Sequence, residues 1–148
     1  NEEAFRLGRL FIIVSIIFPK MSYFAIGAFI SEFVLLNNDT EADEGLVRNL
    51  YQAIWAERRV FSVGAKMIQL HNKELLDDAG DLYCSLGWAF SPAKDKPVSK
   101  DNKKTRVFAC CGGCAIYRRS TLLKLGLFDE NHFAYLKRLN LLKRVLYI

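Results

Sequence analysis

The sequence predicts an α/β protein, a sheet with flanking helices, and two adjacent stretches carry that prediction. Phe33–Leu36 is a continuous apolar run, the pattern of a strand that is buried on both faces of a sheet. Residues 43–57 then place apolar side chains three and four positions apart, which is typical of a helix that packs one face against such a sheet. Acids precede these apolar positions, and they favour the positive end of a helix dipole. We expect this strand and this helix to form the centre of the fold.

The composition is that of one globular domain with a basic end. The chain has 148 residues, of which 51% are hydrophobic and 13% aromatic, so it can form a core and differs from a disordered protein. Its formal net charge is +5, and residues 137–148 hold four basic side chains and no acid. A basic tail without a groove or an aromatic platform beside it does not indicate nucleic-acid binding. We therefore expect no nucleic-acid partner.

The four cysteines allow a zinc site, a redox pair or free thiols. Cys110, Cys111 and Cys114 lie within five positions, Cys84 stands apart, and no second Cys/His pair with ligand spacing follows. A redox C-x-x-C of the thioredoxin kind opens a helix, whereas Cys114 leads into the strand pattern Ala115–Tyr117. We favour free thiols that serve as small apolar residues in a reducing compartment, with a zinc or redox protein as the alternative.

The N-terminal residues 1–31 receive no assignment. The apolar stretches Phe11–Phe18 and Tyr23–Ile30 fit strands or buried helices equally well. Each is shorter than the roughly 20 residues that span a bilayer, and neither forms a convincing signal peptide. A hairpin that lies in a membrane interface is an alternative for the two stretches.

The strand that begins at Phe33 ends in an abrupt polar edge, Asn37-Asn38-Asp39. In open α/β sheets, ligands bind beyond the carboxyl ends of the strands. A carboxylate at that edge can hold a divalent cation, and amides can hydrogen-bond a sugar or ribose hydroxyl. The alternative is an Asx-type turn that only ends the strand.

The middle of the chain predicts short strands and one surface loop. Val60–Val63 and Met67–Leu70 fit two short strands, and turn residues follow within 72–80. Residues 91–106 are polar, contain two prolines and carry most of the mid-chain lysines. We expect them to form a mobile loop at the surface.

After this loop the pattern returns to the interior and then to a short helix. Val107–Cys110 is apolar, and Gly112-Gly113 permits close approach by a ligand or a neighbouring strand. Ser120 is the expected N-cap of a helix over Thr121–Leu125, and Gly126 is its expected stop.

Five segments, in order along the chain, resemble the inverting glycosyltransferases of family 2, close to their rhamnosyltransferase-like branch. The segments are Phe33–Glu41, Val63–Ile68, Asp77–Gly80, Cys111–Ser120 and Gly126–Leu136. The resemblance divides the chain into an unassigned apolar segment 1–31, a glycosyltransferase-like core fragment 32–136 and a basic tail 137–148.

The resemblance implies a partial GT-A fold, a Rossmann-like mixed sheet that binds a nucleotide-diphosphate sugar at its carboxyl edge. Asn37, Asn38 and Asp39 stand where the family has its D-x-D motif. They would bind the nucleotide sugar, and Asp39 would be the ligand of Mg²⁺ or Mn²⁺. The resemblance also implies substrate-binding roles for Gly112, Gly113 and Asp129.

The implied activity is metal-assisted sugar transfer, with inversion, to a glycan or lipid-linked acceptor, as in cell-wall or polysaccharide biosynthesis. The implied location is the cytoplasm, with peripheral association at the inner face of the membrane as a variant. Lys137 and Arg138 stand where the family has a Glu-Asp pair that supplies the general base, and cationic side chains cannot accept a proton at neutral pH. We therefore assign no catalytic residue.

The family's first nucleotide-binding βαβ unit has no counterpart in residues 1–31. We therefore expect the chain to be a fragment with altered ends, in which strand 33–37 lies at an exposed sheet edge. The alternative to a glycosyltransferase fragment is a non-catalytic half-domain or scaffold protein derived from such an enzyme.

Overall fold

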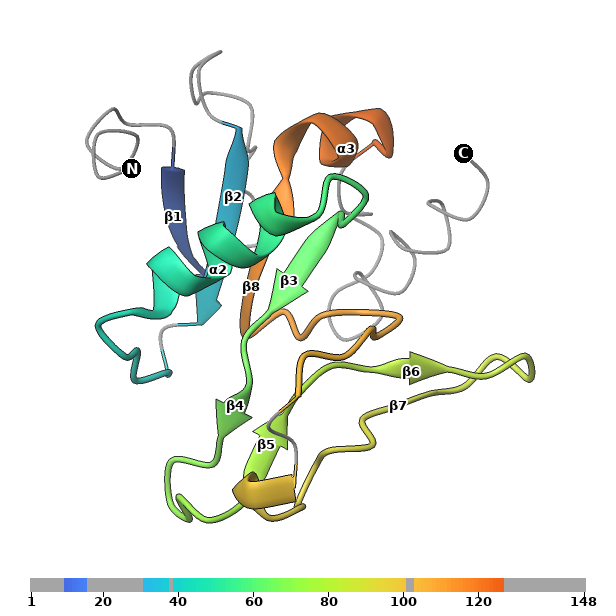
Figure 1. Ribbon diagram of the computed structural model, residues 1–148. Helices are drawn as coiled ribbons and strands as arrows, with labels where there is room; N and C mark the ends of the chain where they lie inside the picture. Colours follow the sequence, from blue (N-terminus) through green and yellow to red (C-terminus); the bar gives the residue numbers. More distant parts are fainter. Residues whose placement is uncertain (1–9, 16–30, 38, 101–102, 127–148) are drawn as a thin grey trace.

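The computed structural model describes residues 10–15, 31–37, 39–100 and 103–126, and of residues 10–15 only the backbone. Helices and strands are mixed along this part of the chain, which confirms the α/β class (Figure 1). The strands are β1 Leu10–Ser15, β2 Glu32–Asn37, β3 Ser62–Gly64, β4 Met67–Ile68, β5 Leu76–Asp78, β6 Leu82–Tyr83, β7 Ala89–Phe90 and β8 Cys114–Arg118. The helices are α2 Leu46–Ala56, α3 Arg119–Lys124 and the short 3-10 helix η2 Val98–Lys100.

The main sheet is mixed and has four strands in the order β1-β2-β8-β3. β2 pairs in parallel with β1 and antiparallel with β8, and β3 pairs antiparallel with β8. The expectation that strand 33–37 lies at an exposed edge is therefore wrong. Residues 10–15, which lie in the segment without an assignment, form a strand beside it and satisfy its backbone groups.

Successive residues of β8 enter the core on opposite faces of this sheet, as the period of a strand requires. Cys114 and Ile116 pack with Val34, Leu50 and Ile54 beneath α2. On the other face, Ala115 and Tyr117 pack with Cys110. All four cysteines are free, as predicted, and the predicted use as apolar core residues is confirmed for Cys110 and Cys114, whereas Cys84 and Cys111 are half-buried.

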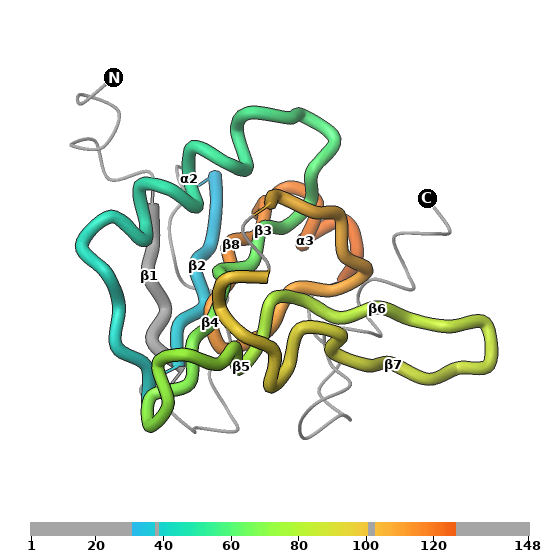
Figure 2. Tube along the Cα trace, turned by 60° about the horizontal axis from the view of Figure 1, so that its bottom comes forward, coloured from blue at the N-terminus to red at the C-terminus, as the bar shows by residue number. Residues whose placement is uncertain are grey.

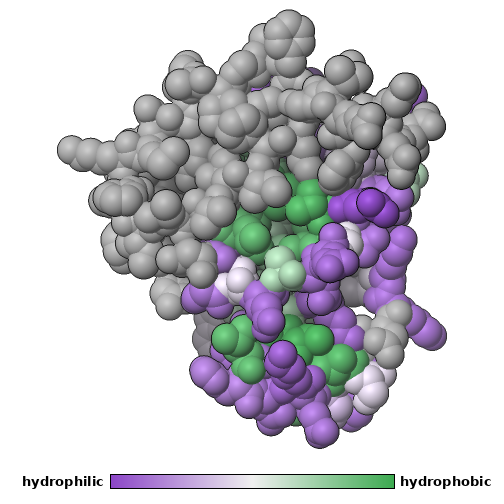
Figure 3. All heavy atoms as spheres, turned by 90° about the vertical axis from the view of Figure 1, so that its left-hand side faces the viewer, coloured by the Kyte–Doolittle hydropathy of each residue, from purple (hydrophilic) through white to green (hydrophobic). Residues whose placement is uncertain are grey.

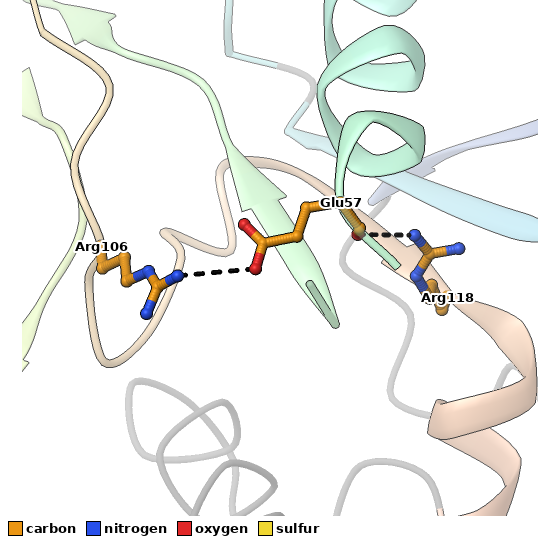
Figure 4. A network of polar contacts seen from close by, with 3 residues as sticks. All are labelled: Glu57, Arg106 and Arg118. Atoms are coloured by element: carbon orange, nitrogen blue, oxygen red, sulfur yellow. Dashed lines mark hydrogen bonds and ion pairs between the residues drawn. The ribbon is translucent and has the colours of Figure 1, made fainter. Parts of the chain in front are cut away.

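Helix α2 lies across one face of the main sheet, where the spacing of its apolar residues predicts it (Figure 1). It begins at Leu46, so the acids that precede it lie before its first turn and do not cap it. At its other end the Arg118 guanidinium donates to the carbonyl oxygens of Ile54 and Val60 (2.7 Å). It also donates to the carbonyl oxygen of Glu57 (3.1 Å; Figure 4). Ile54 lies in the last turn of α2, where carbonyl groups have no partner within the helix, and the bonds to Glu57 and Val60 attach the turn that follows the helix to the end of β8.

A second, smaller part of the fold consists of the β4–β5 pair and the β6–β7 hairpin (Figure 2). The Ser91 hydroxyl lies 3.0 Å from Asp78 Oδ2 and 2.5 Å from Asp81 Oδ1, so it connects two buried carboxylates. Gly80 lies between these acids with φ of 103°, and a Cβ there would come within 2.7 Å of Val107 Cγ1. Only glycine fits that turn.

Residues 91–100 form turns and the short helix η2 at the surface, as their polarity predicts, and this loop is attached to β5. Leu76 N donates to Lys96 O (2.8 Å) and Asp95 N donates to Leu76 O (2.9 Å), so this segment pairs with β5. Ala93 is buried, and η2 follows it. The prediction of a surface loop is confirmed for residues 91–100, and its mobility stays a prediction. Backbone pairing and one buried small apolar residue attach this loop to β5.

Helix α3 begins two residues before its predicted start. Its N-cap is Arg118 without a side-chain cap bond, and Ser120 lies inside the helix, so the predicted Ser120 cap is wrong. The predicted stop is confirmed: Gly126 has φ of 83°, and its N–H donates to Leu123 O. In the described residues, no helix is long and apolar enough to cross a bilayer.

Candidate functional site

The carboxyl end of β2 meets the glycine pair that precedes β8. Asn37 N donates to Gly113 O at a distance of 2.9 Å, one step beyond the last paired residues of the two strands. Thr40 Oγ1 donates to Asn37 O (2.6 Å) and fixes the turn that follows. Asp39 lies in that turn, outside any helix, with an exposed side chain. The structure thus brings together the polar edge and the glycine pair, which lie far apart in the sequence, and we call this region the rim.

Two neighbouring strands end at the rim. Because β1 and β2 are parallel, their carboxyl ends point to the same edge, and Ser15 is paired in register with Asn37. This is the edge at which open α/β sheets bind their ligands.

The two glycines of the rim differ in what surrounds their Cα atoms. A Cβ on Gly113 would lie 2.9 Å from Met67 Cε and 3.2 Å from Met67 Sδ, so a side chain at this position would force the end of the Met67 side chain to move. A Cβ on Gly112 would meet nothing within 4 Å, and Gly112 has no positive φ. Neither the backbone nor the packing of the described residues demands glycine at position 112. As far as the described residues go, the space beside the Gly112 Cα is open.

The loop that carries Asp39 is acidic. Residues 39–44 contain four acidic side chains, all exposed, and of these Glu41 pairs with Lys73 at 3.6 Å. A diphosphate would be repelled by this loop unless a cation accompanied it. The loop therefore suits a metal–diphosphate complex better than a bare diphosphate.

A resident metal does not fit these residues. Among the described residues, no group of three or more His, Cys, Asp or Glu side chains could hold a metal ion. All four cysteines lie in this part of the chain, so the zinc interpretation of Cys84, Cys110, Cys111 and Cys114 is wrong. Mg²⁺, however, is commonly bound through one or two carboxylates together with substrate phosphates and water. Asp39 fits that mode, in which the cation arrives with its ligand.

Cys111 and Cys114 flank the glycine pair. Gly113 N lies 3.4 Å from Cys111 Sγ in hydrogen-bonding geometry. Burial, and secondarily the nearby Cys111 thiol, raises the pKa of Cys114 above its ordinary value. A buried thiol with a raised pKa is a poor nucleophile, which argues against a redox role.

Several residues named from the sequence lie outside the described part of the chain: Asn38, Asp129, Lys137 and Arg138. Of the residues that shape the rim, Thr40 and Met67 were not predicted. Thr40 directly follows the Asn-Asn-Asp stretch, where a hydroxyl that closes the turn is a common signal. Nothing local to Met67 indicates its contact with Gly113.

Comparison of the chain with protein-family models, with curated proteins and with solved structures finds no match.

Proposed function

We propose that this chain is the core of an inverting glycosyltransferase of the GT-A type, which binds a nucleotide-diphosphate sugar at the rim. The observation that carries the proposal is the hydrogen bond from Asn37 N to Gly113 O. It joins the segment that resembles the family's D-x-D motif to the segment that would face the sugar. Had these two segments lain apart, they could not have acted on one ligand.

In this proposal Asp39 binds Mg²⁺ or Mn²⁺ through a single carboxylate. The cation, when bound, neutralises the diphosphate and stabilises the charge that builds on it as the sugar leaves. Asn37 contributes its half-buried amide to a ribose or sugar hydroxyl. Gly112, with open space around its Cα, lets the donor come close to the backbone.

A second candidate is a non-catalytic protein that keeps the binding rim. It is favoured by one sequence observation, namely that Lys137 and Arg138 occupy the places where the family has its general base. Binding of nucleotide sugar is common to both candidates, whereas turnover belongs only to the first.

The first experiment measures binding of a fluorescent nucleoside diphosphate to the full chain, with and without MnCl₂. We expect saturable binding that requires Mn²⁺, because the acidic loop repels the bare diphosphate. Asp39→Asn should weaken binding at least about tenfold, since it removes the only charged ligand of the cation. Asp43→Asn is the matched control, because it removes the same charge from an exposed position of the same loop and should change affinity far less.

Two results would overturn the proposal: binding that is equal with and without Mn²⁺, or equal weakening by both variants, as a general charge effect gives. If binding behaves as expected, the release of nucleoside diphosphate from nucleotide sugars and a glycan acceptor then separates the two candidates. Release above the Asp39→Asn background supports the transferase, and its absence across donors supports the binding protein.

A further inference from the structure

The β6–β7 hairpin projects from the rest of the described chain (Figures 1 and 2). Leu82 pairs with Phe90, and beyond the strands Cys84 N donates to Trp88 O at 2.9 Å. Gly87 N donates to Cys84 O (3.0 Å), and Gly87 has φ of 93°. This is the geometry of a tight hairpin turn with a glycine bulge, which holds the residues at the end in fixed positions.

The two faces of the hairpin differ. On one face, Tyr83 stacks on Phe108 of the main body, with ring centroids 5.1 Å apart. Leu82 and Phe90 lie opposite one another and alternate with Tyr83, so they belong to the other face. Trp88 is two residues from Phe90 and continues that face.

This second face and the turn are unusually exposed. The exposed fractions are 38% for Leu82, 50% for Phe90, 75% for Trp88 and 82% for Leu86 at the turn. In the part of the chain that the structure describes, these are four of the eight large apolar residues that are exposed. On the face seen in Figure 3, a group of apolar side chains lies among hydrophilic ones in the lower half. A contiguous exposed apolar face on a projecting element marks a surface that binds something.

The charge pattern indicates what it binds. Residues 82–93 contain no charged side chain, whereas residues 94–106 contain six basic ones and two acids. The six are exposed: Lys94, Lys96, Lys100, Lys103, Lys104 and Arg106. An uncharged tip with Trp, Phe and Leu suits the interface of a bilayer, where tryptophan settles at the level of the headgroups. Lys94 and Lys96 lie at the base of the hairpin, where Lys94 N donates to Ser91 O (3.3 Å) and Lys96 N to Ala93 O (3.1 Å), and cations in that position are attracted to anionic lipids. Arg106 lies elsewhere, paired with Glu57.

We propose that the hairpin 82–90 inserts Leu86, Trp88 and Phe90 into the surface of an anionic membrane, with Lys94 and Lys96 at the base of the hairpin contacting the headgroups. The proposal does not depend on glycosyltransferase activity, since a binding protein would dock in the same way. It differs from the N-terminal membrane hairpin considered from the sequence, because it rests on a different element.

The chain offers a site-specific probe for this proposal, because it has only two tryptophans, Trp55 and Trp88. In Trp55→Phe the single tryptophan reports on the hairpin. Its emission should shift to shorter wavelength, and acrylamide should quench it less, when vesicles of phosphatidylcholine and phosphatidylglycerol are added. Vesicles of phosphatidylcholine alone should give a weaker response. Trp88→Phe, which retains Trp55 on α2, should show no shift.

Vesicle co-sedimentation tests the contribution of the tip. Leu86→Ser combined with Trp88→Ser should lower the partition coefficient at least about tenfold, because two large apolar side chains are removed. Leu123→Ser is the matched control: Leu123 is 47% exposed on α3 and should not affect partition. Lys94→Gln with Lys96→Gln should lower binding to the anionic vesicles only. Circular dichroism checks that each variant is folded.

Three results would overturn the proposal. Emission of Trp88 that is already shifted without lipid, at any protein concentration, would show that another segment of this chain covers the hairpin. A shift that grows with protein concentration without lipid would assign the face to a second copy. Equal partition of the tip variant and the Leu123→Ser control would exclude insertion by the hairpin.

Discussion

Replacing Arg118 with alanine should lower the free energy of unfolding by about 2–4 kcal/mol, because one guanidinium closes the end of α2. It donates to three carbonyl oxygens and lies 5.3 Å from the centre of the Trp55 ring. A hydrogen bond to a charged group contributes about 1.5–3 kcal/mol, and an exposed cation–π contact about 0.5–1 kcal/mol. The full sum is not expected, because water replaces the guanidinium at this partly exposed helix end.

Urea unfolding followed by circular dichroism at the helix band measures this loss. Arg118→Lys should recover only part of it, because an ammonium group cannot bond three carbonyls in the plane of a guanidinium. Arg119→Ala is the control, because it removes the neighbouring arginine side chain and keeps the backbone hydrogen bond from Arg119 N to Ser31 O. A loss for Arg118→Ala no greater than that for Arg119→Ala would refute the view that these bonds close the helix.

Further predictions concern the glycine pair, a buried thiol and a surface ion pair. Gly113→Ala should lower the free energy of unfolding by about 1–2 kcal/mol, and the loss is limited because Met67 can move its terminal methyl. Gly112→Ala should leave the free energy of unfolding unchanged and weaken Mn²⁺-dependent diphosphate binding. Because the pKa of Cys114 is raised in the folded state, the neutral thiol stabilises the fold fully below the ordinary thiol pKa of 9.0. This stabilisation is lost as the pH rises from 9.0 through the folded-state pKa. Urea midpoints measured across that pH range should fall, and the fall should be smaller in Cys114→Ala. Arg106→Ala should cost less than about 1 kcal/mol, because its 3.5 Å ion pair with Glu57 is exposed and screened; a larger loss would contradict that account.

The elements that the sequence predicts best are those whose burial pattern is local. The run Phe33–Leu36 indicates a strand buried on both faces, the apolar spacing of residues 46–54 indicates a helix with one buried face, and both elements are found where predicted. β8 is found for the same reason, since Ala115–Tyr117 continues directly from a small, apolar cysteine.

The elements that were missed depend on distant partners. β1 has the same apolar pattern as a buried helix, and only its pairing with β2 distinguishes the two. The surface loop at residues 91–100 was predicted, but its backbone pairing with β5 was not, because polar side chains give no signal of it. The start of α3 differs from the prediction because the strand β8 runs directly into the helix at Arg118, leaving no place for a serine cap.

For the rim, the residues themselves gave two separate patterns, a polar edge and a pair of glycines. No spacing rule connects Asn37 with Gly113, and their neighbourhood follows from the antiparallel register of β2 and β8. The distinction between Gly112 and Gly113 is likewise invisible in the sequence, because it depends on where Met67 lies.

Each of the five residues of β8 has a structural role. Alternate side chains supply two different cores, the preceding glycine forms the rim, and the final arginine closes α2. Deleting or inserting one residue there would turn each side chain to the wrong face and carry Arg118 away from the carbonyls at once. Such a change should abolish folding, whereas the same change at the turn of the hairpin, around Leu86, should leave the main sheet intact. Tolerance to length variation should therefore differ sharply between two segments that are only about thirty residues apart in the chain.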